Sequence, residues 1–84
     1  MARSLLRLPK VLAHYGCQRT KLYQLIKDGL FTPPVDLGGR CVAWPDMEVD
    51  SIINARIAGK TDAEIKVLVR ELVSLRNRDV RDAA

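Results

Sequence analysis

Two residue pairs in the middle of the chain, Pro33-Pro34 and Gly38-Gly39, restrict its fold more than any other feature. Each proline excludes the helical conformation from the residue before it, so no helix can run through this stretch. The runs at 35–37 and 41–44 alternate apolar residues with polar or small ones. Because a two-residue hairpin turn needs positive φ at both central positions, Gly38-Gly39 predicts a β-hairpin with Arg40 at its tip.

Two short helical patterns precede the predicted hairpin. The first begins near Pro9, which a first helical turn tolerates, and ends before Gly16, so we expect a helix over residues 9–15. The second covers residues 18–28 and has one apolar face, whose members recur at helical spacing: Leu22, Leu25, Ile26 and Gly29. Two short helices joined by a tight, glycine-containing turn predict a helix-turn-helix.

The face of the second helix that lies opposite its apolar stripe is polar and basic. At about 100° per residue, Thr20, Gln24 and Lys27 lie on this face, and Lys21 and Tyr23 lie beside it. In a helix-turn-helix, the second helix places its exposed side chains in a major groove about 12 Å wide. A hairpin directly after such a helix is a wing, and an arginine at its tip can reach a phosphate or the adjacent minor groove.

The positive charge of the chain is concentrated in its first half. Residues 1–45 carry seven basic and two acidic side chains, a net charge of +5, whereas residues 46–84 carry seven basic and eight acidic ones, a net charge of −1. A basic half beside a balanced half is typical of a polyanion-binding surface, although a basic surface can also serve solubility alone. Combined with the predicted winged helix-turn-helix, the charge indicates double-stranded DNA as the partner.

A third helix is expected directly after the hairpin. Pro45 suits its first position, and the acids Asp46, Glu48 and Asp50 lie in its early turns, where the helix dipole favours negative charge. This placement accounts for the acids without a metal or catalytic site.

The last helix begins with a capping signal. Thr61 and Glu64 have the spacing of a capping box, in which Thr61 bonds the N–H three residues on and Glu64 reaches back. We expect a helix over residues 62–76 and a frayed polar tail over residues 77–84. Helical spacing predicts an apolar stripe along it, made by Ile65, Leu68, Leu72 and Leu75.

This stripe has two interpretations. It either packs back on the preceding domain and completes its core, or serves as an oligomer or partner interface. The chain divides into a winged helix-turn-helix DNA-binding domain over residues 1–59 and an extension over residues 60–84. The predicted fold class is mainly α with a small β-hairpin wing, followed by a C-terminal amphipathic helix.

No catalytic, cofactor or metal site is predicted. Cys17, Cys41 and His14 offer three zinc ligands where a structural site requires four, so ordinary buried thiols explain the cysteines better. The single histidine has no accompanying nucleophile and orienting group, so we do not expect an enzyme. No apolar run approaches the ~20 residues that span a bilayer, and Arg7, Pro9 and Lys10 interrupt any secretory signal, so we expect a cytoplasmic protein with reduced thiols.

An ordered series of motifs extends from about Leu5 to Ile57. It consists of Leu5-Leu6-Arg7-Leu8-Pro9-x-Val11-Leu12, Gly16-x-x-Arg19-Thr20-x-Leu22-Tyr23-x-Leu25-Ile26-x-x-Gly29, Phe31-x-Pro33-Pro34-Val35-x-Leu37-Gly38-Gly39-Arg40, Val42-Ala43-Trp44 and Val49-Asp50. Each motif is weak alone, but the series as a whole resembles the AlpA-like regulators and phage-type excisionases. These are small winged-helix proteins related to the MerR DNA-binding fold. The helix at 62–76 extends past the usual end of the family pattern.

The resemblance implies which residues contact DNA. The second helix enters the major groove and the wing arginine contacts the backbone or the minor groove, which singles out Arg19, Thr20, Lys21, Tyr23, Gln24 and Arg40, with Lys27 on the same exposed face. Two positions depart from the family pattern. Gln18 is a poorer N-cap than the serine often found there, and Lys21 replaces a small hydroxyl residue, so base preference at that position is expected to differ.

Members of this family act in two related ways. Some are excisionases, or recombination directionality factors, which bind and bend attachment-site DNA and help an integrase, a tyrosine recombinase, to excise a prophage or integrative element. Others regulate transcription near such an element. Excisionase-type relatives bind as head-to-tail arrays, which implies self-association on DNA. A third possibility, from the residues alone, is a protein-interaction module that uses the 62–76 helix.

Overall fold

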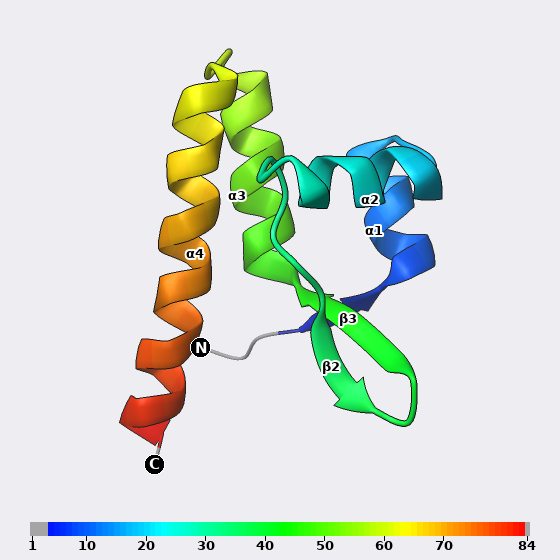
Figure 1. Cartoon of the computed structure of the whole chain (residues 1–84), viewed down its shortest axis with the longest axis vertical. Helices are drawn as coiled ribbons and strands as arrows, with labels where there is room; N and C mark the ends of the chain where they lie inside the picture. The colour runs from blue at the N-terminus through cyan, green and yellow to red at the C-terminus, as the bar shows by residue number, and fades with distance from the viewer. Residues whose placement is uncertain (1–3, 84) are drawn as a thin grey trace.

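The computed structural model describes the backbone of residues 4–83 and the side chains of residues 4–76 (Figure 1). Over this range, a small three-stranded sheet and four helices follow one another in the order β1 (Leu5–Arg7), α1 (Leu8–Tyr15), α2 (Arg19–Lys27), β2 (Val35–Gly38), β3 (Cys41–Pro45), α3 (Asp46–Ile57) and α4 (Asp62–Ala83). The predicted fold class, mainly α with a β-hairpin wing in a winged helix-turn-helix, is confirmed.

Helices α1 and α2 form the predicted pair. Gly16 ends α1 in the left-handed conformation, with a φ of 81°, and its N–H donates to the carbonyl of Leu12 at 2.8 Å. A residue with a Cβ resists this conformation, which explains why the helix ends there. Gln18 is the N-cap of α2, and its side chain makes no capping hydrogen bond, as expected for a glutamine at this position.

The sheet contains one strand that sequence patterns do not reveal. β1 pairs antiparallel with β3, with Leu6 opposite Trp44, and β3 also pairs with β2, so that β3 is central. A three-residue strand is too short to show alternation of its own. Its conformation comes from the hydrogen bonds that its neighbour β3 supplies.

The hairpin turn differs by one residue from the prediction. Gly39 and Arg40, with φ values of 56° and 67°, occupy the turn, whereas Gly38 belongs to β2 and pairs with Cys41. An irregularity in the register between Asp36 and Gly38 produces this shift, and the Asp36 carboxylate accepts a hydrogen bond of 2.8 Å from the Gly38 N–H there. Bulges of this kind favour glycine, so Gly38 occupies the irregular position in β2 and Arg40 becomes the second residue of the turn.

Helix α3 begins one residue later than predicted. Pro45 is the last residue of β3 and the N-cap of α3, so Asp46 holds the first helical position. The backbone N–H of Asp46 donates to the Ser4 carbonyl at 2.8 Å. This bond continues the pairing of β1 with β3, so the pairing extends up to the first residue of α3.

A single apolar core joins the parts of the chain before and after Gly59. It includes Val11, Leu22, Trp44 and Ile52 from the N-terminal part and Ile65, Val69 and Leu72 from α4. Tyr15 packs on Phe31 edge to face at its margin, with ring centroids 5.4 Å apart. Figure 1 shows α4 lying along α3, on the far side of the molecule from α1 and the hairpin.

Helix α4 starts at the predicted capping box and is longer than expected. The Glu64 N–H donates to Thr61 Oγ1 at 3.3 Å, and the Thr61 N–H donates to Glu64 Oε1 at 3.1 Å, which confirms the capping box. The bond from the Thr61 N–H also lowers the pKa of Glu64. The helix continues to Ala83 instead of ending near residue 76. The polar tail therefore continues the backbone of the helix.

A buried ion pair ties α4 to the first turn of α3. Arg76 Nε donates to Glu48 Oε2 at 2.7 Å and Arg76 Nη2 donates to Glu48 Oε1 at 2.5 Å, with side chains only 20% and 5% exposed. The sequence explains Glu48 only as an acid that the helix dipole favours, whereas in the structure its carboxylate is buried and binds Arg76. A two-pronged contact between guanidinium and carboxylate with little water around it is strong and geometrically specific.

Candidate nucleic-acid interface

The exposed face of α2 carries every helix residue that is predicted to contact DNA. The side chains of all six are exposed: Arg19, Thr20, Lys21, Tyr23, Gln24 and Lys27. On the other side of the helix, Leu22 and Leu25 are buried in the core, with 0% and 5% of their surface exposed. Burial of these two leucines determines how the helix is rotated. The polar face therefore stays free for a partner.

Two contacts organise the side chains on this face. The Arg19 guanidinium carbon lies 5.9 Å from the centre of the Tyr23 ring, within the range of a cation–π interaction. Gln24 Nε2 donates to both carboxylate oxygens of Asp28, at 3.2 and 3.3 Å. Sequence analysis did not single out Asp28, although its spacing of four residues from Gln24 is the signal of such a pair on a helix.

The wing places Arg40 at its tip. Arg40 is exposed, and in the described part of the chain it is the one residue other than glycine with positive φ. For an L-residue this conformation costs about 1 kcal/mol. A glycine would avoid that cost, so the conformation of the turn does not itself account for an arginine at this position. Figure 1 shows α2 and the hairpin on the same side of the molecule, away from α4.

The segment between α2 and the wing is held by the core from two directions. The indole Nε1 of Trp44 donates to the Thr32 carbonyl at 2.9 Å, and Arg76 Nη2 donates to the Pro33 carbonyl at 2.8 Å. Thr32 and Trp44 are completely buried. Helix α4 thus supplies one of the two hydrogen bonds that hold this segment between α2 and the wing. Sequence reasoning missed Arg76, because no local pattern links it to residue 33.

The apolar stripe of α4 is divided between the core and the surface. Ile65 and Leu72 are buried, Leu68 is half-buried, and Leu75 is 44% exposed. The burial of Ile65 and Leu72 supports the interpretation in which the stripe completes the core. Leu68 and Leu75 are the members that remain accessible.

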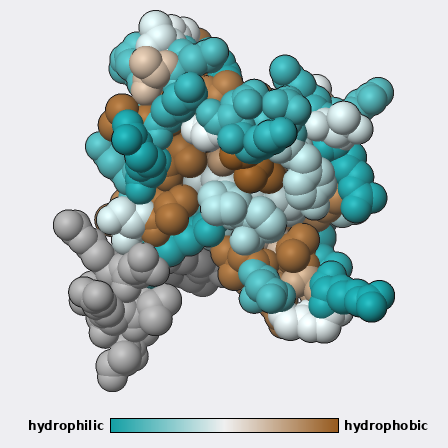
Figure 2. Space-filling model, in the orientation of Figure 1, coloured by the Kyte–Doolittle hydropathy of each residue, from teal (hydrophilic) through white to brown (hydrophobic). Residues whose placement is uncertain are grey.

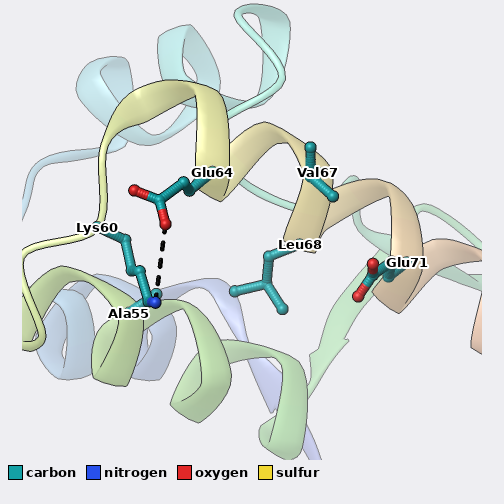
Figure 3. Close-up of a pocket in the computed structure, with 6 residues that line it drawn as sticks. All are labelled: Ala55, Lys60, Glu64, Val67, Leu68 and Glu71. Atoms are coloured by element: carbon teal, nitrogen blue, oxygen red, sulfur yellow. Dashed lines mark ion pairs between the residues drawn. The ribbon is translucent and has the colours of Figure 1, made fainter.

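A shallow groove of about 340 Å³ lies between α3 and α4 (Figure 3). Ala55, Val67 and Leu68 supply its apolar walls, and the exposed ion pair Lys60–Glu64, with 3.7 Å between Nζ and Oε2, lies at one end. In the space-filling view, hydrophilic side chains cover most of α2, and apolar patches lie among hydrophilic side chains over α3, α4 and the hairpin (Figure 2).

The two cysteines are free thiols that lie partly below the surface. Cys17 and Cys41 are free and half-buried, and burial raises the pKa of the Cys17 thiol, which keeps it protonated. Among the residues that the structure describes, no three or more His, Cys, Asp or Glu side chains are grouped so as to hold a metal ion. None of the helices in this same range combines the length and apolar character of a membrane span.

Comparison with known proteins agrees with the predicted resemblance. The family model described as prophage CP4-57 regulatory protein (AlpA) matches residues 4–57. The uncharacterized protein ORF88 of Enterobacteria phage P4 is 46% identical over 55 residues, which make up 66% of this chain and 62% of that protein. No solved structure matches the chain significantly. The chain belongs to the AlpA family of prophage regulatory proteins.

Proposed function

We propose that this protein is an excisionase: it binds and bends attachment-site DNA and helps an integrase to excise a prophage or integrative element. The observation that carries the proposal is the exposed basic face of α2 beside a wing with Arg40 at its tip. Regulation of transcription near such an element is the second candidate, and family membership favours it. Either function operates on DNA in the cytoplasm.

The geometry suits duplex DNA. A helix such as α2 enters the major groove with its polar face toward the base edges, while its buried leucines keep it attached to the core. The wing beside it then reaches the backbone or the next minor groove with Arg40. Contacts in neighbouring grooves hold a bend, because the additional contacts offset the energy of deforming the duplex.

Bending a longer site requires several copies side by side. We assign the contact between copies to the accessible members of the α4 stripe, Leu68 and Leu75, because Figure 1 shows α4 away from α2 and the wing. A head-to-tail contact through this surface leaves the basic face of each copy on the DNA. The integrase is the second partner in this scheme.

Footprinting on DNA that contains the attachment region of an adjacent integrase gene tests the proposal. An excisionase protects repeated blocks about 10 base pairs apart, since successive copies face the same side of the helix. A single protected block at a promoter, with altered transcription from it, supports the regulator instead. Binding that is no tighter than to random DNA at moderate salt contradicts both and leaves a protein-interaction role.

We expect Arg40→Gly to weaken DNA binding without weakening the fold. The loss of one backbone contact lowers affinity for all duplexes by about three- to tenfold and makes the plot of log affinity against log salt shallower by about one unit. The melting temperature stays equal or rises, because glycine adopts positive φ without strain. Fluorescence anisotropy at several salt concentrations and a thermal melt measure both effects.

The control for this variant is Arg70→Ala, which removes an exposed arginine from α4 on the other side of the molecule. It is expected to leave both affinity and salt dependence nearly unchanged. If Arg40→Gly binds as tightly as the wild type, Arg40 makes no DNA contact.

Gln24→Ala is expected to change preference more than affinity. A glutamine that reads one base pair contributes about 1–3 kcal/mol of discrimination at that pair and little elsewhere. Competition with duplexes substituted one base pair at a time should show a flattened preference at a single position. Equal losses on every duplex would show that Gln24 contacts the backbone instead.

A further inference from the structure

Asp28 is an acid on a surface that is otherwise basic. It is exposed at the C-cap of α2, one turn after Gln24, and the other charged side chains of this helix are Arg19, Lys21 and Lys27. Within residues 4–76, whose side chains the structure describes, Asp28 is in no ion pair and is bonded by Gln24 alone. Its polar partner is thus the residue proposed to read a base.

The charge of Asp28 is unfavourable at this position, although its i, i+4 hydrogen bond with Gln24 stabilises the helix. The C-terminal end of a helix carries the negative end of the dipole, so a carboxylate is unfavourable there. On a DNA-binding surface the same carboxylate also repels phosphates. The carboxylate of Asp28 thus opposes the helix dipole and lowers affinity for DNA, and the one described contact of its side chain is the hydrogen bond from Gln24.

The contact determines which way the Gln24 amide faces. A glutamine amide presents a donor from Nε2 and an acceptor from Oε1, and a rotation of 180° about its last bond exchanges them. A carboxylate only accepts, so it attracts Nε2 and repels Oε1. With both Asp28 oxygens within 3.3 Å of Nε2, one N–H of the amide is occupied and the opposite orientation is disfavoured.

The remaining groups of the pair match one base. Gln24 keeps one N–H and Oε1 for the DNA, a donor and an acceptor side by side, which complements N7 and the N6 amine of adenine. Guanine presents two acceptors, O6 and N7, in the major groove. Gln24 Oε1 and the Asp28 carboxylate are acceptors as well, so they repel guanine O6. We propose that Asp28 is a positioning residue, which sets Gln24 to read adenine and to reject guanine. The proposal rests on the proposed DNA binding through α2.

Selection of sites from a randomised duplex library tests this proposal, with binding to single-base variants of the selected site as the second measurement. Wild-type protein should select adenine at one position that Gln24→Ala no longer distinguishes. Asp28→Ala should lower the preference for adenine over guanine there by about fivefold or more. The same change should raise affinity for random DNA about two- to threefold at low salt, because it removes a negative charge near phosphates.

Two variants separate the orienting contact from the charge. Asp28→Asn removes the charge but keeps an acceptor for Nε2, so it should gain affinity like Asp28→Ala and retain more of the adenine preference. Asp50→Asn removes an exposed carboxylate from α3 and should leave base preference unchanged. In the double variant Asp28→Ala/Gln24→Ala, preference at this position should be no weaker than in Gln24→Ala alone.

The outcomes distinguish the two levels of the proposal. If the wild type selects a site and Asp28→Ala selects the same site with equal preference, the positioning role is wrong and DNA recognition stands. Independent, additive losses in the double variant also overturn the role, because they show that Asp28 does not act through Gln24. If the wild type selects no sequence, sequence-specific DNA binding itself fails.

Discussion

A chain that ends at Gly59 is expected to lose cooperative folding. Removing α4 withdraws Ile65, Val69 and Leu72 from the core, where they are 0%, 6% and 7% exposed, and removes Arg76, the ion-pair partner of Glu48. Burial of three aliphatic side chains contributes about 5–9 kcal/mol, which is comparable to the whole stability of a small domain, about 5–15 kcal/mol. Circular dichroism at 222 nm should show a gradual thermal decline in place of a sigmoidal transition.

A matched pair of point variants in α4 controls for the deletion. Ile65→Ala leaves a cavity in the core and should lower the free energy of unfolding by about 2–5 kcal/mol. Val67→Ala changes a side chain that is 46% exposed and should alter it by less than about 0.5 kcal/mol. A cooperative melt of the chain that ends at Gly59 would instead identify α4 as an appendage of an independent domain.

Arg76→Met is expected to be the most damaging single substitution of a charged residue described here. It leaves the Glu48 carboxylate buried without its partner and frees the Pro33 carbonyl. Loss of one member of a buried ion pair costs about 3–5 kcal/mol, because the remaining charge keeps its desolvation penalty. Urea denaturation should show a lower midpoint with an unchanged slope.

Two comparisons test the cause of that loss. Lys60→Met breaks the exposed ion pair Lys60–Glu64, whose side chains are both 53% exposed, and should cost less than about 1 kcal/mol. The double variant Glu48→Leu/Arg76→Met should be more stable than Arg76→Met, since it leaves no buried charge behind. If Arg76→Met and Lys60→Met lower the free energy of unfolding by the same small amount, the burial of Glu48 does not make its ion pair more important for stability.

These variants also bear on function. The Pro33 carbonyl that Arg76 contacts lies between α2 and the wing, so a loosened α4 alters how the two are placed relative to each other. The family match ends at residue 57, before α4 begins. The structure thus shows a helix outside the family pattern that supports the elements within it.

Much of the fold is predictable from short-range signals. Helical spacing and glycine stops define α1 and α2, the proline and glycine pairs predict the hairpin, and Thr61 with Glu64 predicts the start of α4. Each of these signals acts between residues that are close together in the chain, so it is visible in a short stretch of sequence. The exposure of Thr20, Lys21, Tyr23, Gln24 and Lys27 follows from the same periodicity, whereas Arg19, which is also exposed, is implied by the family resemblance alone.

Where a second segment decides the outcome, prediction from sequence fails. β1 is a strand because β3 offers it hydrogen bonds, and the turn lies at Gly39-Arg40 because pairing with β3 includes Gly38 in the ladder. The contact of Asp28 with Gln24 is local, but its consequence for DNA depends on which face of α2 the core leaves exposed.

The sequence by itself determined the helix-turn-helix, the presence of a wing and the polar face of α2, because helix periodicity and turn chemistry are properties of neighbouring residues. Only the tertiary structure decided the division of the α4 stripe and the burial of Glu48 against Arg76, which are 28 residues apart. In sequence, Glu48 is equivalent to its neighbour Asp46, an acid near a helix N-terminus. The difference between them arises from the approach of α4, whose energy depends on packing between segments that are far apart in the chain.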